Sequence, residues 1–134
     1  MILLLTKQQL NSLREGAKKV HPIEACAFLF GKITQKEIVV EIVVTAPNTL
    51  KSTVRFEIDP KIFYQALTQA TKNGLEFIGF FHSHPAPPSP SAVDLEFMKL
   101  WGDAVWVILS SIEDKFAAFQ MIEGKVHSLT LKIK

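Results

Sequence analysis

The sequence predicts one domain of mixed α and β structure (α/β or α+β), in which a mixed β-sheet is flanked by about three helices. The first observation is length, because 134 residues fit a single domain spanning residues 1–134. The second is composition, with 48% hydrophobic and 21% charged residues, close to ordinary globular usage. The third is pattern, since short β-rich runs are interspersed with three segments of helical periodicity.

Four strands and one helix are predicted in the first half of the chain. Apolar residues at helical spacing, after a capping threonine, predict a helix from Thr6 to about Val20. Runs rich in apolar and β-branched residues predict strands over residues 2–5, 24–31, 37–46 and 54–58. The strand over residues 24–31 is expected to be buried and to end at Gly31.

Two helices and four strands are predicted in the second half. Asp59 and Pro60 begin one helix, as an N-cap followed by proline at the first helical position, and Asn73-Gly74 ends it. A further helix is expected over residues 91–101. Strands are expected over residues 76–82, 104–110, 116–123 and 125–134. The near-continuous apolar run in the first of these predicts a central strand.

Charge and cysteine content exclude several classes of protein. A net charge of +2, without any cluster of basic and aromatic residues, predicts neither a nucleic-acid partner nor a membrane partner. The single cysteine, Cys26, excludes an internal disulfide framework, favours a reducing compartment and is expected to be a small core residue. No signal peptide and no apolar run long enough to span a bilayer is present, so a cytoplasmic location is expected.

The stretch FFHSHPAPPSPSAVDLEF, residues 80–97, carries the strongest chemical signal in the chain. His82 and His84 end the predicted central strand. Residues two apart in a strand point to the same side, so the two imidazoles can share one metal ion.

Asp94 is the candidate third ligand. Ser91 and Asp94 have the spacing of a capping box, which places Asp94 in the first turn of the helix that follows. A stiff, proline-rich loop over residues 85–90 can fold this turn back beneath the histidines. Two histidines and one carboxylate are a typical ligand set for catalytic zinc, which keeps a fourth position open.

Such a site also needs a proton acceptor, and the candidate is Glu24. This acidic residue opens the otherwise apolar run EACAFLF, which favours a place at the edge of a sheet. A carboxylate within reach of the attacking water could take its proton and pass it to a leaving amine. Spacing alone does not bring Glu24 next to His82.

Three segments, HPIEACAFLFG, RFEIDP and GFFHSHPAPPSPSAVD, together resemble the JAMM metalloprotease family, the MPN-plus domains. The family signature is a glutamate, a long gap, His-Ser/Thr-His-Pro, a loop, and Ser-x-x-Asp. The resemblance covers nearly the whole chain and is greatest to compact archaeal or bacterial members. It implies a cytidine-deaminase-like MPN fold.

The resemblance also implies roles for five residues. His82, His84 and Asp94 would bind one Zn²⁺ per chain, Glu24 would be the general acid/base, and Ser91 would help to hold the oxyanion. The implied activity is hydrolysis of the bond after the C-terminal tail of a ubiquitin-like modifier or its conjugate. Homodimers occur in this fold family. One departure is that nine residues separate His84 from Asp94, one fewer than the usual family spacing.

Two other functions compete with this one. A non-catalytic MPN scaffold is the alternative, but scaffolds lack part of the Glu, His, His, Asp set that this chain has complete. A nucleoside deaminase of similar fold would need a Pro-Cys-x-x-Cys zinc motif, which a chain with one cysteine does not have. Six further residues are expected to have surface, packing or structural roles rather than catalytic ones. His21 and His127 are expected at the surface, Trp101 and Trp106 in packing, and Asn48 and Arg55 in structural positions.

Overall fold

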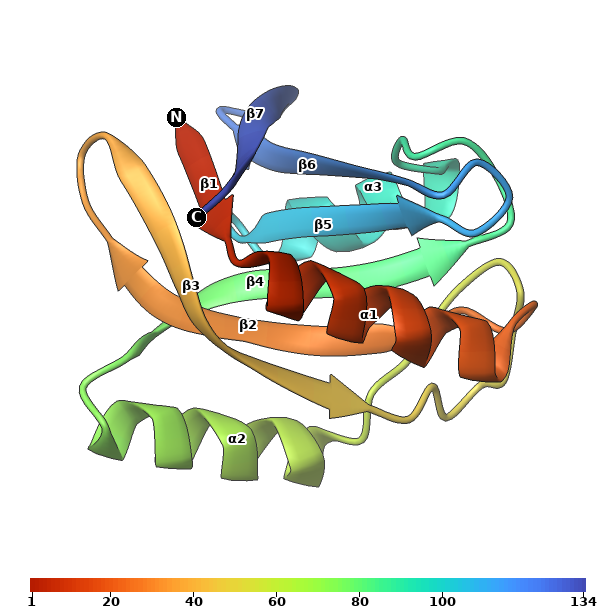
Figure 1. Cartoon of the computed structure of the whole chain (residues 1–134), viewed down its shortest axis with the longest axis horizontal. Helices are drawn as coiled ribbons and strands as arrows, with labels where there is room; N and C mark the ends of the chain where they lie inside the picture. Colours follow the sequence, from red (N-terminus) through yellow and green to blue (C-terminus); the bar gives the residue numbers. More distant parts are fainter.

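The computed structural model describes residues 1–134 and contains seven strands and three helices (Figure 1). In chain order they are β1 (Ile2–Leu5), α1 (Lys7–Val20), β2 (Cys26–Ile33), β3 (Glu37–Ala46), α2 (Pro60–Lys72), β4 (Glu76–His84), α3 (Ala92–Leu100), β5 (Val105–Ser110), β6 (Lys115–Ile122) and β7 (Lys125–Ile133). The predicted mixed α and β architecture with three helices is confirmed.

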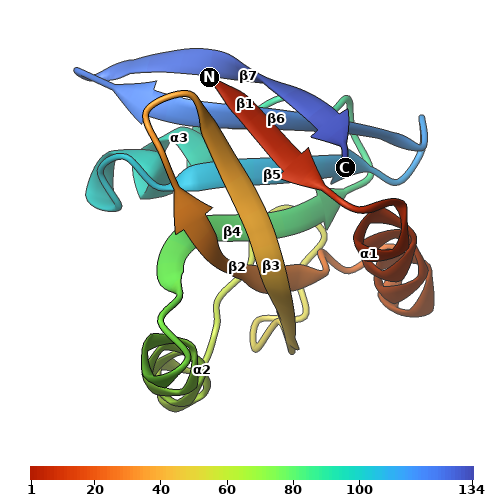
Figure 2. The same cartoon turned by 60° about the vertical axis from the view of Figure 1, so that its left-hand side comes forward.

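The seven strands form one mixed sheet that closes on itself in the order β1-β3-β2-β4-β5-β6-β7. Strand β1 closes it, since it pairs in parallel with β3 on one side and with β7 on the other. The first and last strands therefore lie side by side, as both views show (Figures 1 and 2). Strands β4 and β5 are also parallel, and the remaining pairs are antiparallel.

Two hydrophobic clusters hold the helices on the sheet. Helix α1 contributes Leu10, Leu13 and Ala17 to the larger cluster, as its predicted apolar face requires. Helices α2 and α3 pack into a second, aromatic-rich cluster, on a different face from α1 (Figure 2). Strand β4 lies between β2 and β5 and is buried from Ile78 to its end, which confirms it as central. None of the three helices is long and apolar enough to cross a bilayer.

Side-chain caps define where the helices begin and end, as the sequence predicts. Thr6 and Gln9 form a capping box at α1, and Asp59 accepts from the amide of Lys61 at α2. Helix α2 ends at Asn73, followed by Gly74 with a φ of +73°. That left-handed conformation favours glycine.

The predicted strand over residues 54–58 is absent. Its backbone groups bond to side chains of the preceding loop instead of a strand: Asn48 Nδ2 donates to Arg55 O, and Asn48 Oδ1 accepts from the amide of Glu57. The expected alternation of side chains is nevertheless present, since Phe56 is buried and Arg55 is exposed. Local β propensity is therefore overridden by hydrogen bonds to the preceding loop, several of them from the Asn48 side chain.

The prediction that β2 ends at Gly31 is also wrong, because the strand continues to Ile33. Gly31 marks an irregularity instead, where the register of β2 against β3 shifts between Phe30 and Gly31. A Cβ at Gly31 would lie 1.9 Å from the carbonyl oxygen of Val39. The glycine is therefore required by a close approach of two strands within the sheet.

Candidate active site

His82 and His84 lie at the end of β4 and are almost completely buried, with 0% and 6% exposure. Their rings stack on each other with centroids 5.5 Å apart, as expected for side chains on the same face of a strand. The ring of Phe56 also stacks on His82 at 5.1 Å, and Trp106 meets His82 edge-on. Aromatic packing thus holds the orientation of His82.

Asp94 reaches the histidines from the first turn of α3. Its Oδ2 accepts a hydrogen bond from His82 Nε2 at 3.1 Å and another from the backbone amide of Ser91 at 2.9 Å. Ser91 Oγ accepts from the amide of Asp94 at 3.1 Å, which completes the predicted capping box. The loop that is one residue short of the family spacing therefore still brings Asp94 to His82.

The side chains of His82, His84 and Asp94 could hold a metal ion. One potential ligand atom from each lies within 4.8 Å of the other two, and all three residues are buried. Two of the imidazole nitrogens, His82 Nδ1 and His84 Nε2, are buried without a hydrogen-bond partner. Buried polar atoms rarely lack a partner, so these nitrogens are the kind of donor that a bound metal ion would satisfy.

Glu24 is brought to the same place by the pairing of β2 with β4. Cys26 lies opposite His82 in that ladder, which puts Glu24, two residues before Cys26, close to the histidines. The amide of Ser83 donates to the carbonyl of Ala25, and the amide of Ala25 donates to Ser83 Oγ, both at 3.0 Å. Ser83, which lies between the two histidines, thus holds Ala25, the neighbour of Glu24.

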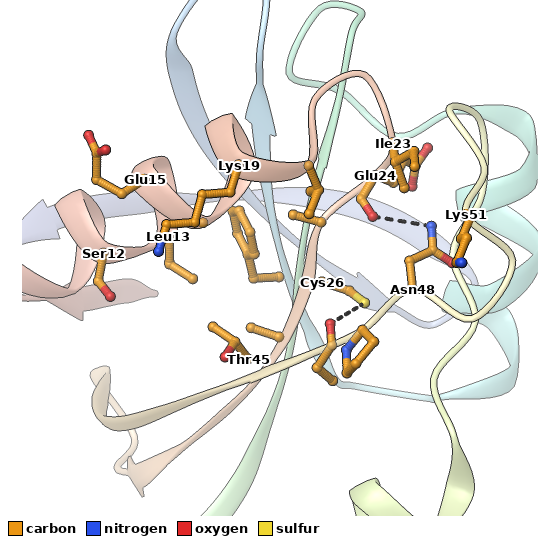
Figure 3. A pocket seen from close by; sticks show the side chains of 17 residues that line it. Ser12, Leu13, Glu15, Lys19, Ile23, Glu24, Cys26, Thr45, Asn48 and Lys51 are labelled. Carbon is orange, nitrogen blue, oxygen red and sulfur yellow. Dashed lines mark hydrogen bonds between the residues drawn. The ribbon is translucent and has the colours of Figure 1, made fainter.

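Asn48 holds Glu24 from the other side, and the prediction of a structural role for Asn48 is confirmed. Its Nδ2 donates to the carbonyl of Glu24 at 3.1 Å (Figure 3). Its other partners are the carbonyls of Ser52 and Arg55 and the amides of Leu50 and Glu57. The amide of Glu24 in turn donates to Ser52 O at 2.8 Å. Both backbone polar groups of Glu24 are therefore held by one loop.

The positioning role of Ser83 was missed by the sequence analysis. The only signal was its place between two candidate ligands, on the strand face opposite to theirs. The Ser83 hydroxyl finds its partner, the amide of Ala25, only through the register of β2 against β4. That register depends on tertiary packing. A buried serine within an apolar strand is the general sign that such a partner exists.

Burial raises the pKa of the Glu24 carboxyl from its ordinary 4.5 to about 7. The charge of His82 opposes this rise and the charge of Asp94 adds to it. Glu24 is only 2% exposed, and its Oε1 has no hydrogen-bond partner. A carboxyl with a pKa near neutrality can both accept and return a proton at physiological pH.

Asp94 and His84 are shifted so that an anionic carboxylate and a neutral imidazole are favoured. Burial alone would raise the pKa of Asp94, but hydrogen bonds and charge from His82, with hydrogen bonds from Ser91, hold it below its usual value. Burial and the neighbouring His82 lower the pKa of His84. Carboxylates and neutral imidazoles are the forms that bind metals.

The core and surface positions predicted for Cys26, the two tryptophans and the two outlying histidines are confirmed. Cys26 is buried, its Sγ donates to Ala46 O, and burial raises the pKa of its thiol to about 12. Trp106 is buried in the core, while Trp101 packs edge-on against Phe80 at 4.8 Å. The surface positions of His21 and His127 are confirmed.

Comparison with known proteins gives a family and a solved relative of the same fold. Residues 6–122 match the model of the prokaryotic homologs of the JAB domain. The solution structure of protein DSY2949 from Desulfitobacterium hafniense superposes with a TM-score of 0.87 and 31% identity, covering the whole of this chain and 93% of that one.

Curated relatives include two archaeal proteins and vertebrate ones. The desampylase of Pyrococcus furiosus is 44% identical over 89 residues, which are 66% of this chain and 60% of that protein. The desampylase of Haloferax volcanii is 32% identical over 75% of this chain and 72% of its own length. The deubiquitinase MYSM1 of Homo sapiens is 35% identical over 54% of this chain, but only 9% of that protein is matched.

Proposed function

Because the chain belongs to the family of prokaryotic homologs of the JAB domain, we propose that it is a zinc-dependent isopeptidase or peptidase. Its substrate would be a ubiquitin-like protein or its conjugate, cut after the C-terminal tail of the modifier. The observation that carries this proposal is the buried cluster of His82, His84 and Asp94 beside the buried carboxyl of Glu24. The names of the relatives, desampylase and deubiquitinase, support the same class of substrate.

The donor set fits one zinc ion. Two imidazoles and one carboxylate are a usual set for catalytic zinc, and His84 Nε2 is buried with no other partner. Zinc bound by these side chains would lower the pKa of water toward about 7 and polarise the substrate carbonyl. The hydrogen bonds of Asp94 to Ser91 and the aromatic packing of His82 would hold the ligands in position.

Glu24 is the proposed general acid/base. Its carboxylate would take a proton from the attacking water as the new C–O bond forms. The same carboxyl would then give that proton to the leaving nitrogen as the C–N bond breaks, so that a carboxylic acid and an amine are released. Asn48 and Ser83 hydrogen-bond to the backbone of Glu24 and Ala25. These bonds would keep the Glu24 carboxyl in place for both proton transfers.

Ser91 is the proposed donor to the oxyanion. Its Oγ is already an acceptor for the amide of Asp94, but a hydroxyl has one donor and two acceptor positions. The cap uses an acceptor position and leaves the O–H free to donate. Capping and transition-state stabilisation therefore do not compete for the same part of Ser91.

The test is cleavage of a ubiquitin-like protein fused through its C-terminal Gly-Gly tail to a second protein. Wild-type protein loaded with zinc should release the tail, and Glu24→Gln should keep its zinc and lose cleavage. Glu57→Gln, at an exposed acidic residue, is the matched control and should cleave normally. A Glu24→Gln variant with full activity would show that the base is another residue. A wild type that binds zinc but cleaves no such fusion or isopeptide would favour the scaffold function.

A further inference from the structure

His84, one of the candidate metal ligands, has a buried serine as its neighbour on β5. His84 is the last residue of β4, and its register partner is Ser110, the last residue of the parallel strand β5 (Figure 1). Register partners in neighbouring strands carry their side chains on the same face of a sheet. The side chains of His84 and Ser110 therefore project from neighbouring positions on one face.

Ser110 is completely buried, with 0% exposure, and its hydroxyl and carbonyl both bond to the turn that follows β5. Ser110 Oγ accepts from the amide of Glu113 at 3.0 Å, and Ser110 O accepts from the amide of Asp114 at 2.8 Å. A serine hydroxyl that accepts from a nearby amide favours a turn conformation over an extended one. Ser110 thus defines the course of the turn over residues 111–114.

This turn holds the carbonyl of His84. The amide of Ser111 donates to His84 O at 3.0 Å, just beyond the last pair of residues that joins β4 to β5. The next residue along the chain is Pro85, which has no amide to donate. The bond from Ser111 is therefore the last that fixes the backbone of His84 before the proline-rich loop begins.

A second contact reaches the far end of the turn, from α1. Asp114 Oδ1 accepts from Arg14 Nε at 2.7 Å, and the guanidinium of Arg14 lies 5.2 Å from the ring centroid of Phe116. The side chains of this ion pair are 29% and 66% exposed, and pairs so open to water contribute little. The buried hydroxyl of Ser110 is therefore the stronger anchor of the turn.

We propose that Ser110 is a positioning residue for His84. Its hydroxyl sets the turn over residues 111–114, and the turn holds the His84 backbone so that the imidazole stays within reach of His82 and Asp94. This inference rests on the proposed function, in which His84 binds zinc. Groups that orient a metal ligand typically contribute about 10–100-fold to metal affinity. Ser110 acts through the backbone and not on the ring, so the lower end of this range is expected.

The first test measures zinc affinity by competition with a chelator. Ser110→Ala should bind zinc about tenfold more weakly than wild type, and Ser110→Thr, which keeps the hydroxyl, should restore most of the affinity. Thr34→Ala is the matched control, because Thr34 Oγ1 likewise accepts from an amide three residues on, that of Glu37. Thr34 lies in the turn between β2 and β3, at the opposite end of β4 from His84, so this variant should bind zinc like wild type.

The second test reports the geometry of the site. Cobalt in place of zinc absorbs visible light, and its spectrum depends on the number and arrangement of its ligands. At saturating cobalt, the spectrum of Ser110→Ala should differ from that of wild type, and the spectrum of Thr34→Ala should not. A hydroxyl that serves stability alone would leave the spectrum of the folded, saturated variant unchanged. Thermal melting checks that each variant folds.

The third test needs no metal. Hydrogen exchange of the Ser111 amide should be about tenfold faster in metal-free Ser110→Ala than in wild type, because this amide is protected only while the turn is formed. The amides of Phe80 and Phe81, in the middle of β4, should change less. Equal exchange of Ser111 in the two proteins would show that Ser110 does not hold the turn.

The outcomes separate this inference from the proposed function. Wild type and Ser110→Ala with equal zinc affinity and identical cobalt spectra would overturn the role of Ser110 and leave the zinc site intact. A folded Ser110→Thr that binds zinc as weakly as Ser110→Ala would overturn the role of the hydroxyl. If wild type binds neither metal, the proposed function fails, and the exchange of the Ser111 amide alone decides whether Ser110 holds the turn against His84.

Discussion

Ser83 and Ala25 are joined by two hydrogen bonds of 3.0 Å, one from each backbone amide. One links the backbones of the two segments, and the other uses the Ser83 hydroxyl as acceptor. Through them, the residue between the two candidate histidine ligands is tied to the neighbour of the candidate base. The geometry of the acid/base relative to the metal ligands therefore depends on a residue that touches neither substrate nor metal.

Replacing Ser83 with alanine should disturb this geometry and reduce stability. The amide of Ala25 would lose its acceptor, at a cost of about 1–3 kcal/mol in the free energy of unfolding. Turnover should fall more than zinc affinity, because Glu24 shifts while the three ligands keep their partners. Urea denaturation and single-turnover kinetics measure the two effects. Ser83→Thr keeps the hydroxyl and should restore turnover, whereas an alanine variant as active as wild type would contradict the positioning role.

Asn48→Asp should loosen the loop that holds Glu24. The acceptor Oδ1 stays, but the three bonds donated by Nδ2 are lost. A loss of about 2–4 kcal/mol of stability is expected, since these hydrogen bonds are each worth about 1 kcal/mol and a carboxylate would face the same carbonyls. Thermal unfolding measures this loss. Thr49→Ala, which removes one hydrogen bond to Glu57 in the same loop, is the milder comparison and should cost less than half as much.

Ser91→Gly separates the two roles proposed for Ser91. Glycine is an adequate N-cap, so stability should fall by only a few tenths of a kcal/mol. Loss of the hydroxyl donor should lower turnover by about 10²–10³, with zinc retained. Chemical denaturation, metal analysis and kcat together provide the measurement. If turnover changes less than about threefold, a factor well below that for an oxyanion donor, Ser91 serves only as the cap.

Glu24 should make the stability of the protein depend on pH when metal is removed by a chelator. Its pKa is about 7 in the folded chain and 4.5 in the unfolded one, so the folded state binds more protons between these values. Stability from this group is complete below pH 4.5 and is lost as pH rises through 7. The loss amounts to a few kcal/mol at most.

Other groups near Glu24 make stability change with pH in the opposite direction. The contribution of Glu24 is therefore measured as the difference in stability between wild type and a variant without this carboxyl. The lowered pKa of His84 makes stability rise with pH up to the ordinary 6.5 of histidine. Urea denaturation of wild type and Glu24→Gln across pH 4.5–8 isolates the contribution of Glu24. The wild type should lose stability relative to the variant as pH rises. Parallel curves would mean that the Glu24 carboxyl is not shifted.

Most elements could be predicted because their signals are local. The capping boxes at Thr6 and Ser91 and the N-cap at Asp59 define the three helix starts, and each uses residues within three positions of one another. The same holds for His82 and His84, since the side to which they point follows from their spacing in a strand.

The features that escaped prediction depend on contacts between distant segments. Closure of the sheet brings Ile2 opposite Thr130, and no local pattern encodes that pairing. The segment over residues 54–58 has the composition of a strand, yet its backbone groups are taken by Asn48. Glu24 meets the histidines only through the register of β2 on β4, so a resemblance to a family was needed to connect it with them.

The zinc content of the purified protein tests the central claim most directly. Protein incubated with excess zinc and then dialysed should retain about one zinc per chain by elemental analysis. The His84→Gln variant should retain far less, because the nitrogen that lacks any other partner is gone. Wild-type protein that retains no zinc, or a His84→Gln variant that retains as much as wild type, would contradict the assignment of His82, His84 and Asp94 as the metal site.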